Sequence, residues 1–180
     1  MLELTILGEE LWDEKKEEFF TLEEKTLKLE HSLVSLSKWE SKWCKPFIDN
    51  DGLTTEETID YIRCMTLTQN VDPEIYNRLT DDNIRQINEY IDAPMTASWV
   101  REDKSGKSNS ERITSELVYY WMISHGIPFE CQKWHLNRLL MLIKVCNAKN
   151  QPAKKMSRDE IIAQQAALNE ARRKQFNSKG

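Results

Sequence analysis

The sequence has no stretch of about 20 apolar residues, the length that an α-helix needs to cross a bilayer. Its N-terminus opens Met1-Leu2-Glu3-Leu4-Thr5, without the basic region and apolar core of a secretory signal. We therefore expect a protein that is neither secreted nor inserted in a membrane.

Cysteines are few, and their spacing does not suit disulfides or zinc. Cys44, Cys64, Cys131 and Cys146 are far apart and form no C-x-x-C pair, so we expect reduced thiols in a reducing compartment. Cys131 and His135 are four apart on a predicted helix and would supply only two zinc ligands, whereas protein zinc sites use three or four. We expect no metal site and no cofactor.

Glycine and proline are also scarce, at five each, which favours a helical protein over a β-sandwich.

Motifs of enzymes are also missing. The segment Gly106-Lys107-Ser108 lacks the upstream glycine of a phosphate-binding loop. A Cys131–His135 nucleophile pair would lack the loop or helix-start setting that activates a thiol. Carboxylates occur in runs with lysine, which is typical of solvated faces. We therefore expect that the protein is not an enzyme.

Charge is distributed unevenly along the chain. The total is −5, but residues 149–180 contain eight Lys or Arg and three Asp or Glu, so they carry +5 and the rest carries −10. An acidic body with a basic tail can self-associate head to tail, bind an acidic partner or touch nucleic acid weakly. A solvated terminal helix is the simpler interpretation.

The N-terminus has the period of β-structure. Leu2, Leu4 and Ile6 alternate with polar residues, which predicts a strand over 2–7. A second strand is predicted over 19–29, and the acidic residues 8–18 are predicted to form an exposed connection.

The helical period begins at His31. Apolar residues then recur at steps of three and four, at Leu33, Leu36, Trp39, Trp43 and Phe47. This spacing predicts an amphipathic helix that Pro46 helps to end. Further helices are predicted over 54–68, where Thr54 can act as the N-cap, near 72–73 and over 80–91.

The most apolar part of the chain follows a polar loop predicted over 92–108. Asn109 or Ser110 is predicted to cap a helix that carries Ile113, Leu117, Tyr120, Trp121 and Ile123. A turn at 126–128 leads into a second arm that runs from 129 to 145. We expect this helical hairpin to form the centre of the hydrophobic core.

A last helix is predicted over 161–176, after the capping-box spacing of 157–160. Its composition favours a helix, but its apolar stripe is thin, at Ile161, Gln165, Leu168 and Arg172. A helix with so thin an apolar stripe has little surface to pack against the body, so it is a candidate for docking onto a partner.

Together these patterns predict an α+β protein that is predominantly α-helical, with five to seven helices. We expect an N-terminal β-hairpin or small sheet over 1–30 that packs on the body, a helical body over 31–150, and a protruding basic helix over 151–180.

Two of the six tryptophans are predicted to lie in exposed connections, where aromatic residues flanked by charge are typical of protein interfaces. The other four, Trp39, Trp43, Trp121 and Trp134, fall on helical stripes and are predicted in the core. Together with the tail, the exposed tryptophans give the candidate partner-binding residues, which are Trp12, Trp99, Ile161, Leu168, Arg172 and Arg173.

Five blocks of the sequence resemble tail assembly proteins encoded by siphophages and prophages, and they span nearly the whole chain. They are LEHSLVSLSKWESKW at 29–43, DYIRCMT at 60–66, INEYI at 87–91, PFECQKWHLNRL at 128–139 and ARRKQ at 171–175. Proteins of this family are regarded as tail assembly chaperones.

The resemblance implies a non-enzymatic partner of the tape measure protein, the long helical polypeptide that sets tail length. Such a chaperone would act in the cytoplasm of the bacterial host, with other tail proteins as further partners. It would cover the apolar faces of the long helices until tail-tube subunits polymerise around them, because an unpaired amphipathic helix is an aggregation hazard.

Two alternatives come from other classes of protein. A virion structural component, such as a head-tail connector or tail terminator, would remain in the finished particle. A small nucleic-acid-binding regulator would need a recognition helix with clustered arginine and asparagine, whereas the basic residues here are diluted along the tail. We expect neither a membrane partner nor a nucleic acid.

Overall fold

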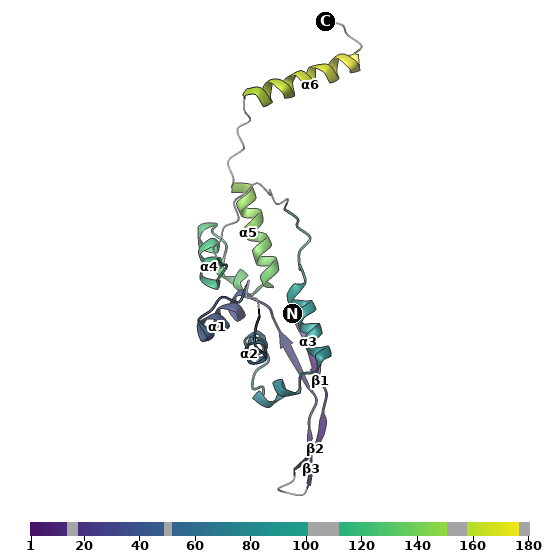
Figure 1. Cartoon of the computed structure of the whole chain (residues 1–180), viewed down its shortest axis with the longest axis vertical. Helices are drawn as coiled ribbons and strands as arrows, with labels where there is room; N and C mark the ends of the chain where they lie inside the picture. The colour runs from purple at the N-terminus through teal and green to yellow at the C-terminus, as the bar shows by residue number, and fades with distance from the viewer. Residues whose placement is uncertain (14–17, 49–51, 101–111, 151–157, 177–180) are drawn as a thin grey trace. The chain divides into compact units, whose positions relative to one another are not determined.

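The computed structural model describes residues 1–13, 18–48, 52–100, 112–150 and 158–176 (Figure 1). These residues confirm an α+β fold that is mostly helical. The chain divides into two compact units, Met1–Ala148 and Lys149–Gly180. Among the described residues, no helix is long and apolar enough to cross a membrane.

All strands of the described residues belong to one antiparallel hairpin, drawn in purple and blue in Figure 1. They are β1 (Leu2–Ile6), β2 (Glu9–Asp13), β3 (Glu18–Leu22) and β4 (Lys25–Leu29). Facing residue numbers add to 31 in both pairs of strands, as for Leu4 opposite Leu27 and Trp12 opposite Phe19. The hairpin therefore keeps one register along its length.

The prediction of an exposed connection over 8–18 is wrong for β2. Its acidic residues suggested a loop, but β2 places Leu11 opposite Phe20 and Trp12 opposite Phe19. The backbone pairing with β3 forms the strand, so the charge of this segment did not exclude a ladder.

The β1–β4 half of the hairpin is part of the core. Leu4, Ile6, Leu27 and Leu29 are at most 2% exposed. The outer edge of β4 is covered by the segment after α2 (Thr55–Met65), since the Glu30 amide donates to the Met65 carbonyl. The hairpin is thus anchored through β1 and β4, while β2 and β3 form its far end (Figure 1).

Helix α2 begins at its predicted cap, because Thr54 forms a capping box with Glu57. Helix α1 (Leu33–Trp43) is capped by Ser32, whereas the helical period was predicted to begin at His31. The end of α1 differs from the prediction, because the helix stops at Cys44, whose φ of 52° is left-handed, before Pro46 is reached.

The next elements are η1 (Pro73–Arg78), α3 (Asp81–Asp92), α4 (Ser115–Ser124), η2 (Phe129–Lys133) and α5 (Leu136–Asn150). The predicted second arm of the hairpin over 129–145 is therefore wrong as a single helix. It breaks before Leu136, whose amide donates to the His31 carbonyl at 2.7 Å. This bond to a distant segment replaces a bond within the helix.

Helix α4 presents a different face to the core from the one expected. Val118 and Met122 are fully buried, whereas Tyr120 and Ile123, predicted in the core, are 63% and 64% exposed. The cap of α4 is Thr114, while the predicted caps at 109 and 110 lie outside the described residues. Apolar residues surround this short helix, so their period could not identify the buried side.

Four tryptophans were predicted in the core, and one of them is fully buried. Trp39 has no exposed surface, whereas Trp43, Trp121 and Trp134 are partly exposed and pack against the core from its edge. In the second unit, α6 (Arg158–Phe176) forms over the predicted tail helix.

A buried histidine pair joins three parts of the first unit. The rings of His31 and His135 meet edge to face with centroids 5.1 Å apart. His31 Nδ1 lies 2.6 Å from the Tyr61 hydroxyl, and His135 Nε2 lies 2.9 Å from the Tyr90 carbonyl. Both rings are at most 6% exposed, so a charge on either would be costly.

The histidine pair predicts a loss of stability in mild acid. Burial, and then the neighbouring His135, lowers the pKa of His31 from 6.5 to about 3. Between these values the unfolded chain holds a proton on His31 that the folded chain lacks, so stability falls as the pH falls. From pH 7 to pH 5 we expect His31 to cost about 2 kcal/mol of unfolding free energy.

Urea unfolding of the wild type and of His31→Gln at both pH values measures this cost. The difference between pH 7 and pH 5 should shrink by about 2 kcal/mol in His31→Gln. Gln86→Asn, an exposed substitution that neither adds nor removes a titrating group, serves as the control and should keep the wild-type pH dependence. An unchanged pH dependence in His31→Gln would contradict the prediction.

Candidate functional site

An apolar depression that suits a macromolecular partner lies between α2 and α3. Two adjoining hollows, of about 430 and 500 Å³, share Leu53, Thr58 and Ile84 in their linings. We call their combined surface the α2–α3 groove. Its apolar lining residues are Phe47, Leu53, Ile59, Tyr61, Ile62, Tyr76, Leu79, Ile84, Ile87 and Ile91.

The groove follows from the way in which each helix divides its apolar residues. On α3, Ile87 is 1% exposed and fixes the helix to the core, while Ile84 and Ile91 on either side of it are partly exposed. On α2, Ile62 is buried in the same way and Ile59 is left partly exposed. The core thus covers half of each apolar stripe, and the other half lines the groove.

Polar groups in the lining are small and uncharged, apart from one acid. Thr55, Thr58, Asn77 and Asn88 contribute hydroxyl and amide groups, and Asp81 contributes a carboxylate. Side chains of this kind can orient a ligand without the desolvation cost of many buried charges. The groove therefore has the lining of a binding surface.

The helices that form the groove are acidic. Together α2 and α3 contain seven Asp or Glu and two Arg, a net charge of −5. Lys45 binds Glu57 and Lys42 binds Asp60 at 2.5 Å, which neutralises two of these acids and leaves −3. An exposed surface of one sign attracts a partner of the other sign.

The two paired carboxylates lie at the start of the groove wall and stay ionised. A hydrogen bond from Lys45 and one from the Thr54 amide lower the pKa of Glu57. Burial opposes ionisation of Asp60, but hydrogen bonds from Lys42 and from the Trp43 indole lower its pKa overall. These bonds fix the C-terminal end of α1 against α2, so this wall of the groove is firmly placed.

A groove of this size between two helices can hold one face of a third helix. Helix α3 has 12 residues and is about 18 Å long, which matches three turns of a partner helix. Recognition would then use apolar anchors of the partner spaced at i, i+3 or i+4, and i+7.

Of the predicted partner-binding residues, Trp99 lies in the same unit as the groove and is not among the residues that line it. Trp99 is exposed by 76%, as the sequence predicts, and lies after α3. In the second unit Leu168 is exposed by 52%, and Arg172 and Arg173 are exposed too. The side chains of Trp12 and Ile161 lie outside the described residues, so these two predictions stay untested.

The lining of the groove was missed at the level of the sequence. The spacing of Ile84, Ile87 and Ile91 does predict an amphipathic α3. It does not say which of the three the core covers, because α2, η1 and α3 meet only in the folded chain. Partial burial is the signal that finds the groove, and it requires the structure.

A second apolar surface lies on α4 and η2. Tyr120 and Ile123 on α4 and Phe129 on η2 are all more than half exposed. None of the three lines the α2–α3 groove. Exposed apolar side chains that lie together are typical of contacts with other proteins.

The Cys131–His135 pair does not lie on one helix face, which corrects the expectation from spacing. Cys131 belongs to η2 and His135 precedes α5, with its Nε2 bound to the Tyr90 carbonyl. The described residues contain no cluster of three or more His, Cys, Asp or Glu that could hold a metal ion.

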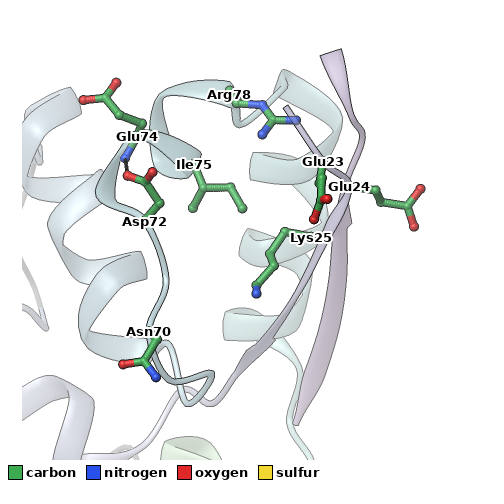
Figure 2. A pocket seen from close by; sticks show the side chains of 8 residues that line it. All are labelled: Glu23, Glu24, Lys25, Asn70, Asp72, Glu74, Ile75 and Arg78. Atoms are coloured by element: carbon green, nitrogen blue, oxygen red, sulfur yellow. Dashed lines mark hydrogen bonds between the residues drawn. The ribbon is translucent and has the colours of Figure 1, made fainter. Parts of the chain in front are cut away.

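Figure 2 shows a smaller hollow, of about 280 Å³, beside η1 and the hairpin. Its side chains are mostly charged and of both signs, from Glu23, Glu24, Lys25, Asn70, Asp72, Glu74, Ile75 and Arg78. Asp72 caps η1 by accepting from the Glu74 amide at 3.0 Å, and Arg78 donates to the Leu7 carbonyl. These two residues hold η1 and the hairpin in place.

Comparisons of the chain with protein-family models, with curated proteins and with solved structures each give no match.

Proposed function

We propose that this chain is a non-enzymatic tail assembly chaperone of a siphophage or prophage that binds the tape measure protein. The observation that supports the proposal is the α2–α3 groove, an apolar surface of the right length for one face of a partner helix. In the host cytoplasm it would cover apolar stripes of the tape measure protein until the tail tube encloses them.

The physical reasoning links the groove to the client. A tape measure protein is a long helical chain, and before assembly its apolar stripes face water. Partly exposed isoleucines on α2 and α3 can exchange their own contact with water for contact with such a stripe. Each fully buried aliphatic side chain contributes about 1.5–3 kcal/mol, so two or three anchors give a reversible complex.

The first experiment is co-expression with the tape measure protein of the same phage, followed by pull-down and a solubility assay. Recovery of a soluble complex, together with absence of the chain from purified virions, supports the chaperone. If no complex forms and the chain is present in purified virions, the virion structural component replaces it as the interpretation.

Variants of the groove give a sharper prediction. Ile84→Glu places a charge in the apolar lining and should weaken client binding about 30-fold or more, equivalent to about 2 kcal/mol. Asn88→Arg should also weaken binding, because an exposed lining residue becomes a long, charged one. Titration of a labelled tape measure fragment measures both affinities.

The matched control is Leu67→Glu, which makes the same apolar-to-acid change at a side chain that is 57% exposed and outside the groove. It should leave the affinity within about twofold of the wild type. Thermal melting checks that Asn88→Arg is folded. If Ile123→Glu on α4 abolished binding and both groove variants kept it, the exposed apolar surface of α4 and η2 would be the site and the groove would be rejected.

A further inference from the structure

Helix α6 exposes apolar and basic side chains together. Leu168, Arg172 and Phe176 recur at steps of four and so lie along one side of the helix. Leu168 is 52% exposed, Phe176 is 73% exposed, and Arg172 is exposed between them. The ends of this stripe are eight residues, or about 12 Å, apart.

Helix α6 would gain stability from a partner. It has 19 residues, and most of the stability of a helix in a protein comes from packing of its apolar face rather than from propensity. Its composition supports a helix, but exposed leucine and phenylalanine on one side contribute nothing until they are covered. A complementary surface should therefore both bind α6 and stabilise it.

The α2–α3 groove is complementary to this stripe in size, polarity and charge. Its apolar lining suits Leu168 and Phe176, and α6 is longer than the 18 Å or so of α3. The net charge of residues 149–180 is +5, whereas α2 and α3 retain −3 after pairing with lysine. Asp81 is the one charged residue in the lining, and the other acids of α2 and α3 would act on Arg172 through the net charge of the two helices.

We propose that α6 of one copy binds the α2–α3 groove of a second copy, so that the free protein self-associates head to tail. The groove is then covered while no client is present. This inference does not rest on the chaperone function, since self-association through the groove needs only two copies of the chain. A client helix and α6 would compete for the same surface.

Sedimentation velocity of the full chain tests the inference. In low salt the wild type should form dimers or larger species, and in about 0.5 M salt it should shift toward monomer, because salt screens the attraction between tail and groove. Wild-type protein that stays monomeric at every concentration in low salt would overturn the proposal. So would a monomer whose α6 amides are protected from hydrogen exchange, since α6 would then be docked within its own chain.

Single-residue variants locate the contact. Leu168→Gln keeps helix propensity and removes an anchor, and Asn88→Arg adds a cation to the groove. Each alone should weaken self-association at least tenfold. An equal mixture of the two should recover association, because an intact tail on one chain meets an intact groove on the other. Leu67→Glu is the control and should behave as the wild type.

Failure of the mixture to recover would overturn head-to-tail binding. The two proposals also separate in these variants, since Leu168→Gln should lose self-association and still bind the tape measure protein. Self-association without client binding rejects the chaperone function alone. Client binding by a strictly monomeric chain rejects the self-association alone.

Discussion

Trp39→Ala is expected to lower the free energy of unfolding by about 3–5 kcal/mol. Trp39 has no exposed surface, and its ring lies 5.1 Å from the Phe47 ring and 6.5 Å from the Tyr61 ring. Its indole nitrogen donates to the Glu57 carbonyl at 2.9 Å. Alanine would leave a cavity between α1 and α2 and remove that hydrogen bond.

Chemical denaturation at neutral pH measures the effect. Trp99→Ala is the matched control, because it removes the same side chain where it is 76% exposed, and it should change stability by less than about 0.5 kcal/mol. Trp39→Phe should fall between the two, since it keeps much of the volume. A loss below about 1 kcal/mol for Trp39→Ala would show that the core does not depend on this ring.

Glu40→Ala is expected to cost about 3 kcal/mol, a large effect for a charged residue. Glu40 is 7% exposed, and its carboxylate accepts from two backbone amides, that of Phe47 at 2.9 Å and that of Ser115 at 2.7 Å. Ser115 begins α4, so one side chain of α1 holds both the segment after α1 and the start of a helix 75 residues away. Alanine leaves both amides without this acceptor, and the amide of Ser115 is buried.

Glu40→Gln tests whether the second acceptor matters. A glutamine carbonyl can replace one carboxylate oxygen, but the amide nitrogen cannot accept, so the expected loss is about half that of alanine. Glu56→Ala removes an exposed acid from the first turn of α2 and should cost less than about 1 kcal/mol. Equal losses in Glu40→Ala and Glu56→Ala would refute the linking role.

The starts of α2 and α3 were well predicted, because each cap is a local pattern. Thr54 and Thr80 accept from the amides three residues later, within a single turn of chain. A local pattern is not always sufficient. Thr114 caps α4 in the same way by accepting from the Leu117 amide, but Asn109 and Ser110 nearby are equally good candidates in the sequence.

Predictions of secondary structure failed where contacts with a distant segment of the chain determine the structure. The predicted helix over 129–145 breaks at His135 because His31 supplies the acceptor for the following amide. The residues at 9–13 form β2 because β3 faces them in register. In both cases the local pattern favours one structure, and a partner far along the chain stabilises another.

The sequence by itself determined the predominantly helical class, the N-terminal β-structure, the caps of α2 and α3, and the charge contrast between body and tail. The tertiary structure decided which apolar residues are covered: Ile87 but not Ile84, and Met122 but not Ile123. Periodicity reports only that a residue lies on an apolar stripe. Whether that stripe becomes core or a groove depends on the elements that pack beside it, and these are brought together by contacts that no local pattern contains.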